Sequence, residues 1–388
     1  MMKNNVLKVV APDSCCGCGT CETVCPKQCI QLKEQVDGFL YPKVNEADCI
    51  ECGLCIKKCP ELSHHSVNDV KSVYAACCKD LSLLKSANSG GVFSLLALWY
   101  IENKHAWVCG AAYTETLEVE HILVGTVEEF KRLQGSKYVQ SKCHHLFPAI
   151  KEKLQQGQMV LFSGTGCQTT AIRNYLGKDY DNLLLIEMVC HGVPSPGLFR
   201  KYLQWLEQKE HLKIDFFKFR SKAKRPTGEH GIFTFGNSET QRYGYSYEDP
   251  YYGSFLAGRT LRGSCYQCKF RGKERCSDLT LGDFWGIEKA VKDFPVKNGT
   301  SLLVVNSMKG KNALDCVSEK LLLAETTYDF AVRRNPSITK CADKPLKPVD
   351  YHSSDLFGDE LAVKCSFKNK IKSRIPWWMK TLLKRYLG

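Results

Sequence analysis

Apolar residues in this chain gather in short uninterrupted runs, and small or polar residues follow each run. A short apolar run without alternation predicts a strand that is buried on both faces of a sheet. The runs that predict such strands are residues 73–78, 108–113, 159–163 and 183–189. A longer run at residues 92–100 predicts a helix, with Asn88 or Ser89 as its N-cap. Strands interleaved with helices predict a large α/β domain built on a mixed α+β sheet.

The later part of the chain has weaker patterns. Residues 216–224 are basic and aromatic and predict an edge strand, whereas residues 231–236 and 246–255 are rich in Phe and Tyr and predict strands and core. Residues 341–374 lose the apolar periodicity and predict a loose extension. Residues 376–387 predict a basic amphipathic helix whose apolar face is Trp378, Met379, Leu382, Leu383 and Tyr386. Such a helix suits peripheral contact with the inner face of a membrane, and docking to another protein is the alternative.

The patterns also predict where the parts of the chain begin and end. The expected parts are a small N-terminal domain at 1–62, a linker at 63–71, a large domain at 72–340 and an extension at 341–388. The linker is polar and without periodicity, so its histidines, His64 and His65, are expected in solvent rather than on a metal.

Charge and cysteine content narrow the class of protein. Lys and Arg outnumber Asp and Glu by 54 to 41, a formal net charge of +13, but no nucleic-acid recognition motif accompanies the excess. An acidic protein, an anionic coenzyme or a lipid surface is therefore expected as partner, and nucleic acid is not. Without a long apolar run or a signal peptide, the chain is expected in the cytoplasm. There, 22 cysteines argue for metal ligands rather than disulfides.

Eight of these cysteines repeat one spacing twice. The pattern Cys-x2-Cys-x2-Cys-x3-Cys-Pro, typical of bacterial two-cluster ferredoxins, occurs at Cys15, Cys18, Cys21 and Cys25 and again at Cys49, Cys52, Cys55 and Cys59. The fourth cysteine of each run ligates the other cluster, so one 4Fe–4S cluster is expected on Cys15, Cys18, Cys21 and Cys59, and a second on Cys49, Cys52, Cys55 and Cys25. Zinc is the alternative, but it explains neither the third close cysteine nor the proline.

Two features of this N-terminal domain follow from the same pattern. The fourth cysteine of each run is expected to begin a helix that leads away from its own cluster. Between the runs, residues 30–40 predict a hairpin that turns at Asp37 and Gly38. Together they predict a small bacterial-ferredoxin-like domain.

Four further cysteines predict a third metal site in the large domain. Cys265 and Cys268 form a Cys-x2-Cys pair, which is half of a site. Cys167 and Cys190 each follow a predicted buried strand, where open α/β sheets bind ligands, and they are the expected remaining ligands. Cys276 is the alternative ligand. The spacing leaves zinc open beside a third 4Fe–4S cluster, and an isolated buried cysteine remains the plainer interpretation of Cys167 or Cys190 taken singly.

Two segments suit a phosphate-bearing cofactor. Residues 86–91 are small and polar and precede a predicted helix, whose free N–H groups form an anion site suited to a flavin pyrophosphate. Residues 135–138 combine Gly, Ser, Lys and Tyr, a set that holds a phosphate or a flavin edge. The alternatives are a plainly capped helix and a surface loop with an extended lysine.

The order of these motifs, together with residues 164–167, 190–192 and 282–285, resembles the coenzyme F420 hydrogenase/dehydrogenase beta-subunit family over about residues 10–325. The resemblance implies an FAD-binding α/β domain with its own 4Fe–4S cluster beside the flavin. The implied cofactor residues are Ser86, Asn88, Ser89, Gly90, Gly91, Ser136, Lys137, Tyr138, Gly164 and Thr165. The chain departs from the family at Gly166, where proline is usual, and in the basic segment after Arg220. Similar bacterial proteins often lie among cell-surface polysaccharide genes, which makes a sugar-linked or lipid-linked substrate an alternative to F420.

The expected function is an iron–sulfur flavoprotein oxidoreductase. Electrons would pass from a ferredoxin-like donor or partner subunit through 4Fe–4S clusters to FAD, and on to an organic or deazaflavin acceptor. Lys137 is expected to offset the charge of reduced flavin, and His191 and Tyr138 are expected proton donors. The alternative is an electron-transfer subunit of a larger complex without substrate chemistry of its own.

Overall fold

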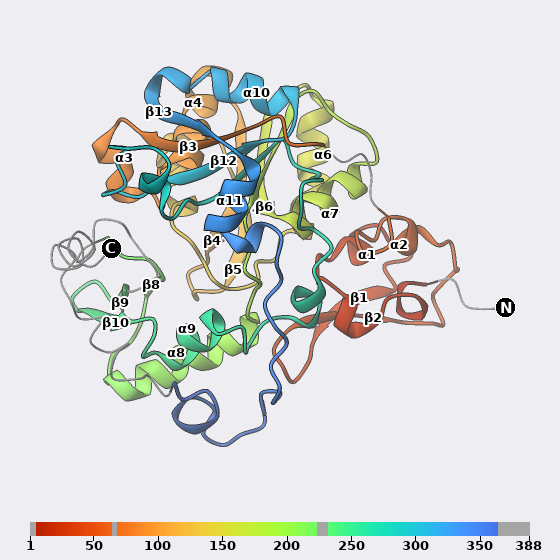
Figure 1. Ribbon diagram of the computed structural model, residues 1–388. Helices are drawn as coiled ribbons and strands as arrows, with labels where there is room; N and C mark the ends of the chain where they lie inside the picture. The colour runs from red at the N-terminus through yellow and green to blue at the C-terminus, as the bar shows by residue number, and fades with distance from the viewer. Residues whose placement is uncertain (1–4, 64–67, 223–231, 364–388) are drawn as a thin grey trace.

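The computed structural model describes residues 5–63, 68–222 and 232–363 (Figure 1). An eight-stranded mixed sheet forms the centre of these described residues. Its order is β13 (Leu321–Thr326), β3 (Ser72–Cys78), β12 (Ser301–Val305), β11 (Leu279–Asp283), β7 (Leu183–Met188), β6 (Val160–Thr165), β4 (Trp107–Tyr113) and β5 (Val119–Val124). The four strands from β11 to β4 run parallel, and those outside them pair antiparallel. The four strands predicted from the apolar runs are confirmed as β3, β4, β6 and β7.

Helices cover both faces of this sheet. One face packs against α3 (Leu81–Ser86), α4 (Val92–Lys104) and α10 (Met308–Asp315), and the other against α6 (Phe147–Gln155), α7 (Gly166–Leu176) and α11 (Tyr328–Arg334). The shorter turns are α5 (Val127–Phe130), η3 (Lys131–Leu133), η4 (His144–Leu146), η6 (Ile287–Lys289), η7 (Ser318–Lys320) and η8 (Pro336–Ile338). The helix predicted at 92–100 is confirmed as α4, but its N-cap is Gly91, in the left-handed conformation (φ 76°). Asn88 and Ser89 are not its caps, because their side chains bind Ser136 and the Thr300 carbonyl instead.

An aromatic lobe lies below the sheet in Figure 1. It contains α8 (Pro196–Glu210), α9 (Pro250–Leu256) and a three-stranded sheet of β10 (Gln241–Tyr245), β9 (Ile232–Gly236) and β8 (Phe216–Lys218). The strand predicted at 231–236 is confirmed as β9. The edge strand predicted at 216–224 is confirmed at residues 216–218 alone, since residues 219–222 form no strand and residues 223–231 lie outside the described part. The strand predicted at 246–255 is wrong, because Asp249 caps helix α9 by accepting from the Tyr252 N–H (2.6 Å) and Pro250 opens its first turn.

The described part of the extension packs onto this lobe. Leu356, Phe357 and Leu361 are buried, on and just after the π-helical turn η9 (Leu356–Glu360). The ring of Phe357 lies 5.6 Å from that of Tyr202. The prediction of a loose extension is therefore wrong at residues 356–361, whereas residues 341–355 carry no helix or strand and are mostly exposed. The amphipathic helix predicted at 376–387 and the linker histidines lie outside the described residues, and the membrane contact stays a prediction. Within the described part, no helix has the length and apolar character to cross a membrane.

The N-terminal cysteine runs form a small separate module at the right of Figure 1. Its elements are η1 (Val6–Lys8), η2 (Pro12–Ser14), α1 (Thr20–Thr23), β1 (Ile30–Glu34), β2 (Leu40–Val44) and α2 (Leu54–Lys57). The predicted hairpin is confirmed, with a longer loop than a two-residue turn. The fourth cysteine of each run does not begin a helix. Gly19 and Gly53, with φ of 75° and 71°, turn the chain into α1 and α2 before the third cysteine, so Cys25 and Cys59 follow these helices.

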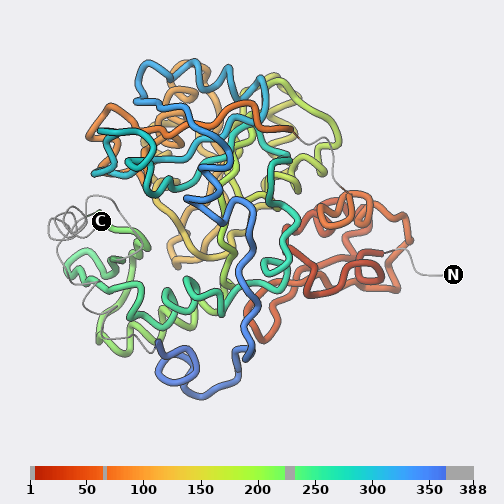
Figure 2. The backbone as a smooth tube through the Cα atoms, in the orientation of Figure 1, coloured from red at the N-terminus to blue at the C-terminus, as the bar shows by residue number. Residues whose placement is uncertain are grey.

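The hairpin tip of this module contacts the start of α8, and Figure 2 shows the backbone of both parts. The Ser195 hydroxyl donates to the Asp37 carbonyl (2.6 Å), and the Gly197 N–H donates to the Gly38 carbonyl (3.1 Å), at the start of α8. A Cβ at Gly38 would lie 2.8 Å from the Gly197 Cα, so glycine permits this approach. The small module is thereby held beside the carboxyl ends of the parallel strands.

Candidate iron–sulfur and flavin site

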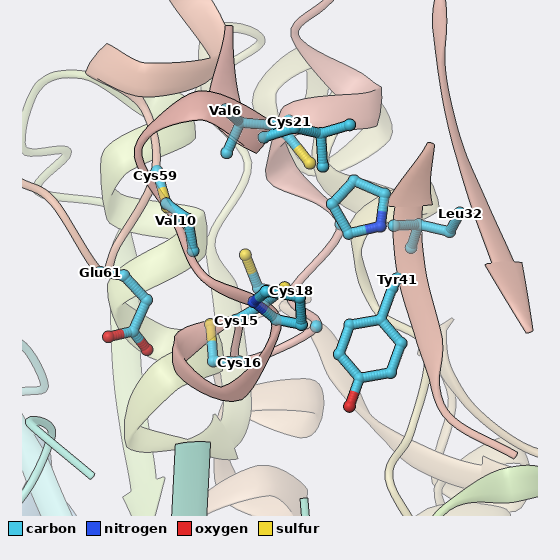
Figure 3. A pocket seen from close by; sticks show the side chains of 15 residues that line it. Val6, Val10, Cys15, Cys16, Cys18, Cys21, Leu32, Tyr41, Cys59 and Glu61 are labelled. Carbon is cyan, nitrogen blue, oxygen red and sulfur yellow. The ribbon is translucent and has the colours of Figure 1, made fainter. Parts of the chain in front are cut away.

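The first cysteine set surrounds a cavity of about 120 Å³ (Figure 3). All four predicted ligands line it: Cys15, Cys18, Cys21 and Cys59. The other walls are mostly apolar, and burial raises the pKa of the Cys59 thiol to about 12. Thiolates in this apolar cavity are stable only with a cation bound to them, because burying a negative charge without a partner is costly. The four cysteines fit a 4Fe–4S cluster at this position.

The second set, Cys25, Cys49, Cys52 and Cys55, belongs to the same module and differs in exposure from one cysteine to the next. Cys55 is buried, whereas Cys52 is exposed. A further buried cysteine, Cys29, lies against this set, with its sulfur 3.4 Å from that of Cys25. Burial raises the pKa of Cys29 to about 12. The motif spacing gave no signal for Cys29, because it follows the first run by four residues and lies outside the pattern.

The third set comes together from three segments of the large domain. Cys167 lies in the first turn of α7, Cys190 follows β7, and η5 (Gly263–Gln267) carries Cys265 and leads to Cys268. All four line one cavity of about 40 Å³. Cys276 does not line it and lies beside Thr170 of α7. The four cysteines thus share one cavity, and their role as ligands stays a prediction. Among the described residues no three Cys, His, Asp or Glu converge on a point suited to a single metal ion.

Cys16 connects these sites. Its buried side chain lines the cavities of the first and third sets and also a larger cavity beside them. The Cys16 thiol hydrogen-bonds the sulfurs of Cys18 and Cys167, and this contact lowers the pKa of both, that of Cys18 to about 7. For Cys167 this contact with Cys16 is the largest cause of the shift, and burial opposes it. The ferredoxin spacing concealed Cys16, because it occupies a variable position of the run.

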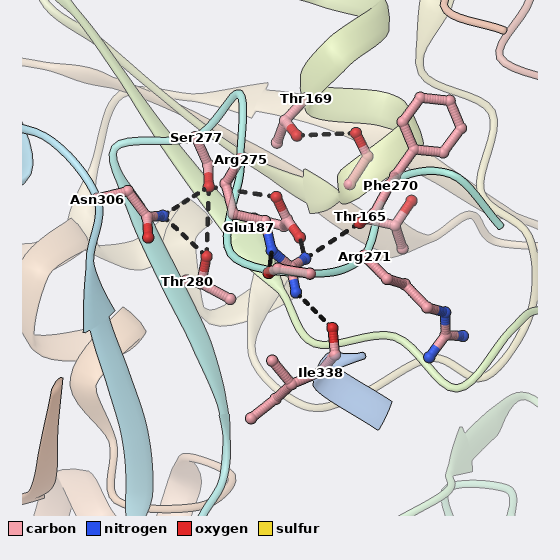
Figure 4. A network of polar contacts seen from close by, with 12 residues as sticks. Thr165, Thr169, Glu187, Phe270, Arg271, Arg275, Ser277, Thr280, Asn306 and Ile338 are labelled. Carbon is pink, nitrogen blue, oxygen red and sulfur yellow. Dashed lines mark hydrogen bonds and ion pairs between the residues drawn. The ribbon is translucent and has the colours of Figure 1, made fainter. Parts of the chain in front are cut away.

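A buried polar network lies beside the third set, because Glu187 and Arg275 line the same cavity as its four cysteines (Figure 4). Glu187 near the end of β7 pairs with Arg275, and both side chains are at least 95% buried. Arg275 also donates to the carbonyls of Ile338 and Phe270, and Ser277 donates to the second carboxylate oxygen of Glu187. Burial raises the pKa of Glu187, while the guanidinium opposes that shift. The network fixes the strand end from which Cys190 projects.

The larger cavity measures about 460 Å³ and lies at the carboxyl ends of the parallel strands. This volume is within the range of about 300–1,000 Å³ typical of cofactor sites. The first turn of α4, from Val92 to Ser94, lines one wall, and its N–H groups suit a pyrophosphate. Cys167 and Cys190 line another wall, so a molecule bound here would adjoin the third cysteine set. Its volume and its polar lining suit a phosphate-bearing cofactor, and FAD at this place stays a prediction.

Most of the residues predicted to bind FAD line this cavity. Those that do are Asn88, Ser89, Gly91, Ser136, Lys137, Tyr138, Gly164 and Thr165. Ser86 and Gly90 do not. The Ser86 hydroxyl donates to the Leu83 carbonyl, and the Gly90 N–H donates to the Ser301 hydroxyl. Neither polar group is therefore directed at a ligand.

Gly90 has a packing reason to be glycine, and we predict its effect on stability. A Cβ there would lie 2.1 Å from the Ala76 carbonyl oxygen. Gly90→Ala should lower the free energy of unfolding by about 1–3 kcal/mol through overpacking, even in the chain without flavin. Gly110→Ala, whose Cβ would meet Leu133 at an ordinary 3.4 Å, is the matched control. Urea unfolding followed by circular dichroism measures both; equal stability of the two variants would contradict the packing role.

The three predicted catalytic residues also line the cavity, in different settings. The Lys137 ammonium donates to the carbonyls of Arg132, Leu133 and Gln134, and burial lowers its pKa to about 7. The Tyr138 ring stacks on Phe255 at 4.9 Å, and burial raises the pKa of its hydroxyl. His191 contacts the same phenylalanine edge-on. Their chemical roles stay predictions.

Sequence reasoning left three cavity residues without a role. Arg220 and Asp283 form a buried ion pair at 2.9 Å on its wall. His121 lies at 1% exposure with Nε2 2.9 Å from the Ser163 carbonyl, and burial lowers its pKa to about 4. Arg220 lies in the basic segment at 216–224, and Asp283 lies in the motif at 282–285, so the sequence marked both segments without indicating an ion pair. A lone histidine such as His121 has no sequence signal.

Two family models match the chain. Residues 157–329 match the model of the C terminus of the coenzyme F420 hydrogenase/dehydrogenase beta subunit, and residues 14–62 match a 4Fe-4S dicluster domain. The first lies over the third cysteine set and much of the large cavity. The second covers both N-terminal runs.

Individual proteins are similar to the chain in the same regions. The F subunit of the F(420)H(2) dehydrogenase of Methanosarcina mazei is 26% identical over 245 residues, which cover 59% of this chain and 69% of that protein. The B subunit of the Na(+)-translocating ferredoxin:NAD(+) oxidoreductase complex of Acetobacterium woodii is 38% identical over 63 residues, 16% of this chain and 18% of that protein. A chain of the F420-reducing NiFe hydrogenase complex from Methanosarcina barkeri is 14% identical, with a TM-score of 0.45 and coverage of 66% and 83%.

Proposed function

We propose that this chain is an FAD-dependent oxidoreductase. Its residues 157–329 belong to the coenzyme F420 hydrogenase/dehydrogenase beta-subunit family, and its residues 14–62 form a 4Fe–4S dicluster domain. The resemblance predicted from the motifs is confirmed by these matches. An iron–sulfur electron-transfer protein of an oxidoreductase family is thereby established. The flavin, the third cluster and the acceptor are the proposed part.

The observation that carries the proposal is the convergence of three cavities on Cys16. The cavity of the first set, that of the third set and the large cavity all include its side chain. Cys15, Cys18, Cys21 and Cys59 would hold one cluster, and Cys167, Cys190, Cys265 and Cys268 another, with the large cavity beside both. An FAD bound there would supply the exchange between single electrons and a hydride pair.

The chain's own residues have defined tasks at this place. The α4 N-terminus and the polar residues Asn88 and Ser136, hydrogen-bonded to each other at 2.7 Å, would orient the phosphates. Tyr138 and Phe255 form a flat apolar wall that would exclude water from the reacting edge. Lys137, whose pKa is lowered to about 7, would hold or release a proton near neutral pH.

The partners that we propose are a ferredoxin-like donor or a redox partner subunit, and an organic or deazaflavin acceptor. The names of the relatives support a partner subunit, since they describe subunits of larger assemblies. A sugar-linked or lipid-linked acceptor and a role in cell-surface polysaccharide metabolism remain predictions of the sequence. A second candidate function is an electron-transfer subunit without substrate chemistry. The same names support it, because a subunit of a larger assembly can pass its electrons to a partner subunit.

Anaerobic purification followed by iron, sulfide and flavin analysis tests the proposal. We expect about twelve irons and one FAD per chain, because three ligand sets of four cysteines each hold a four-iron cluster. About eight irons with no flavin would overturn the proposed enzyme and leave the electron-transfer subunit. Flavin with about eight irons would overturn the third cluster alone.

A further inference from the structure

Arg262 is a fully buried cation that extends from the large domain into the ferredoxin module. Its side chain is 1% exposed. Nε donates to the Cys15 carbonyl (2.5 Å), and one terminal nitrogen donates to the Leu40 carbonyl (2.9 Å) and lies 3.6 Å from the Cys15 sulfur. The guanidinium also lies over the Tyr41 ring, 4.2 Å from its centre. Cys15 is a ligand of the first set, so the charge lies at the edge of that site.

This buried charge has no carboxylate directly against it. None of the ion pairs among the described residues includes Arg262. Glu61 is influenced by the guanidinium only as a minor effect on its pKa. A buried cation without a counter-charge is strongly unfavourable. The anion that adjoins Arg262 is the first cysteine set, which with a 4Fe–4S core carries roughly −2 when oxidised and one charge more when reduced.

The backbone of Arg262 contacts the loops that carry two cysteines of the third set. Its N–H donates to the Val193 carbonyl (3.0 Å), in the loop that carries Cys190, and its carbonyl accepts from the Cys265 N–H (2.9 Å). The side chain thus holds the loop of the first set while the main chain holds two loops of the third. No comparable contact from Arg262 reaches the second set among the described residues.

Gln140 completes this connection without adding charge. Its amide nitrogen donates to the Cys16 carbonyl (2.8 Å), and its oxygen accepts from Arg262 (3.0 Å). Gly17 fits against both side chains, since a Cβ there would lie 2.7 Å from the guanidinium carbon and 2.8 Å from the Gln140 nitrogen. The two side chains together clamp residues 15–17.

We propose that Arg262 is a positioning residue that raises the reduction potential of the cluster held by Cys15, Cys18, Cys21 and Cys59 above that of its neighbour, and so favours electrons on the cluster beside the large domain. Reduction adds one electron to the cluster, and a fixed cation stabilises the more negative form. Among the described residues Arg262 contacts Cys15 of the first set and no cysteine of the second, so the second cluster gains less from this charge. The proposal rests on the dicluster domain alone, and neither FAD nor the third cluster is required for it.

The test is an anaerobic redox titration of the full chain, with dithionite as reductant and the reduced clusters followed by electron paramagnetic resonance. Two neutral variants, Arg262→Met and Arg262→Gln, are compared with Arg262→Lys, which keeps the charge. Gln140→Leu is the matched control, because it removes a clamp contact but no charge. Iron content is measured for each variant, so that loss of a cluster is distinguished from a shifted potential.

We expect both neutral variants to lower the reduced-to-oxidised ratio of one N-terminal cluster about tenfold at a fixed potential, a shift of about 59 mV for one electron. In the neutral variants, the reduced-to-oxidised ratio of the other N-terminal cluster should stay within about threefold of its value in the unmodified chain. In Arg262→Lys and in Gln140→Leu, the ratios of both N-terminal clusters should stay within the same limit. Unchanged potentials in a neutral variant that keeps its iron would overturn the proposal. Equal shifts in Arg262→Lys or Gln140→Leu would also overturn it, because loss of docking rather than of charge would then explain them. Absence of flavin would refute the proposed enzyme and leave this result intact.

Discussion

Cys268→Ala should lower the iron content of the anaerobically purified chain from about twelve to about eight atoms, with the two N-terminal clusters retained. Cys268 lines the cavity of the third set together with Cys167, Cys190 and Cys265, and it does not line the large cavity. Its loss removes one of four thiolates, so one iron of the cluster would lack its protein ligand and be open to solvent. Iron and sulfide analysis measures the change, and flavin content should be little affected.

Cys276→Ala is the matched control for this prediction. Cys276 is buried at 6% exposure, lies eight residues further along the chain, and contacts Thr170 rather than the third set. Its replacement should leave the iron content unchanged. Equal iron in the two variants, whether both high or both low, would contradict the ligand set that we assign. Loss in Cys276→Ala alone would instead identify Cys276 as the ligand.

Four of the eight strands of the central sheet, β3, β4, β6 and β7, were predicted from apolar runs that are buried on both faces, whereas β5, β11, β12 and β13 were not predicted. β6 and β7 are nearly all buried, and each begins with an apolar run, residues 160–162 and 183–186, that stands out from the rest of the chain. The segment that became α9 was not predicted as a helix. Its aromatic residues suit a strand by propensity, and the capping signal of Asp249 and Pro250 decided the outcome.

The ligand sets were predictable to different degrees. The first two sets follow a fixed spacing within about 45 residues, because each cluster is wrapped by local loops. The third set required the further inference that strand ends of a parallel sheet meet at one edge. Cys167 and Cys190 follow β6 and β7, which are adjacent in the sheet, and this inference placed them together.

Residues that act across the chain had no local signal. Arg262 and Cys15 are 247 positions apart, and Gln140 and Cys16 are 124 apart, so no window of sequence contains either contact. Gly90 is the opposite case, because its sequence pattern predicted a cofactor-binding role that its contacts do not support. A glycine before a helix is typical of a phosphate loop, but here the neighbouring strand leaves no room for a Cβ. A local sequence pattern therefore marks residues as candidates for a role, and the contacts in the fold show which role each residue has.

Breaking the buried ion pair beside the third set should have the largest effect on stability. Arg275→Met leaves the Glu187 carboxylate buried without its cation, and we expect the free energy of unfolding to fall by about 3–5 kcal/mol. Urea unfolding under anaerobic conditions, followed by circular dichroism, measures this loss. The three carbonyls that Arg275 also binds, those of Phe270, Gly272 and Ile338, add to it.

The loss should depend on pH in a definite direction. Burial already raises the folded-state pKa of Glu187 above its ordinary value of 4.5, and removal of Arg275 removes the charge that opposes this shift. The folded variant then binds a proton that the unfolded chain releases, so its stability falls as the pH rises above 4.5. The gap between Arg275→Met and the unmodified chain should therefore be smaller at pH 5 than at pH 8. A double variant, Glu187→Met with Arg275→Met, should recover part of the stability at pH 8 and lose this pH dependence. A gap that stayed constant between the two pH values would mean that the carboxylate is not the origin of the instability.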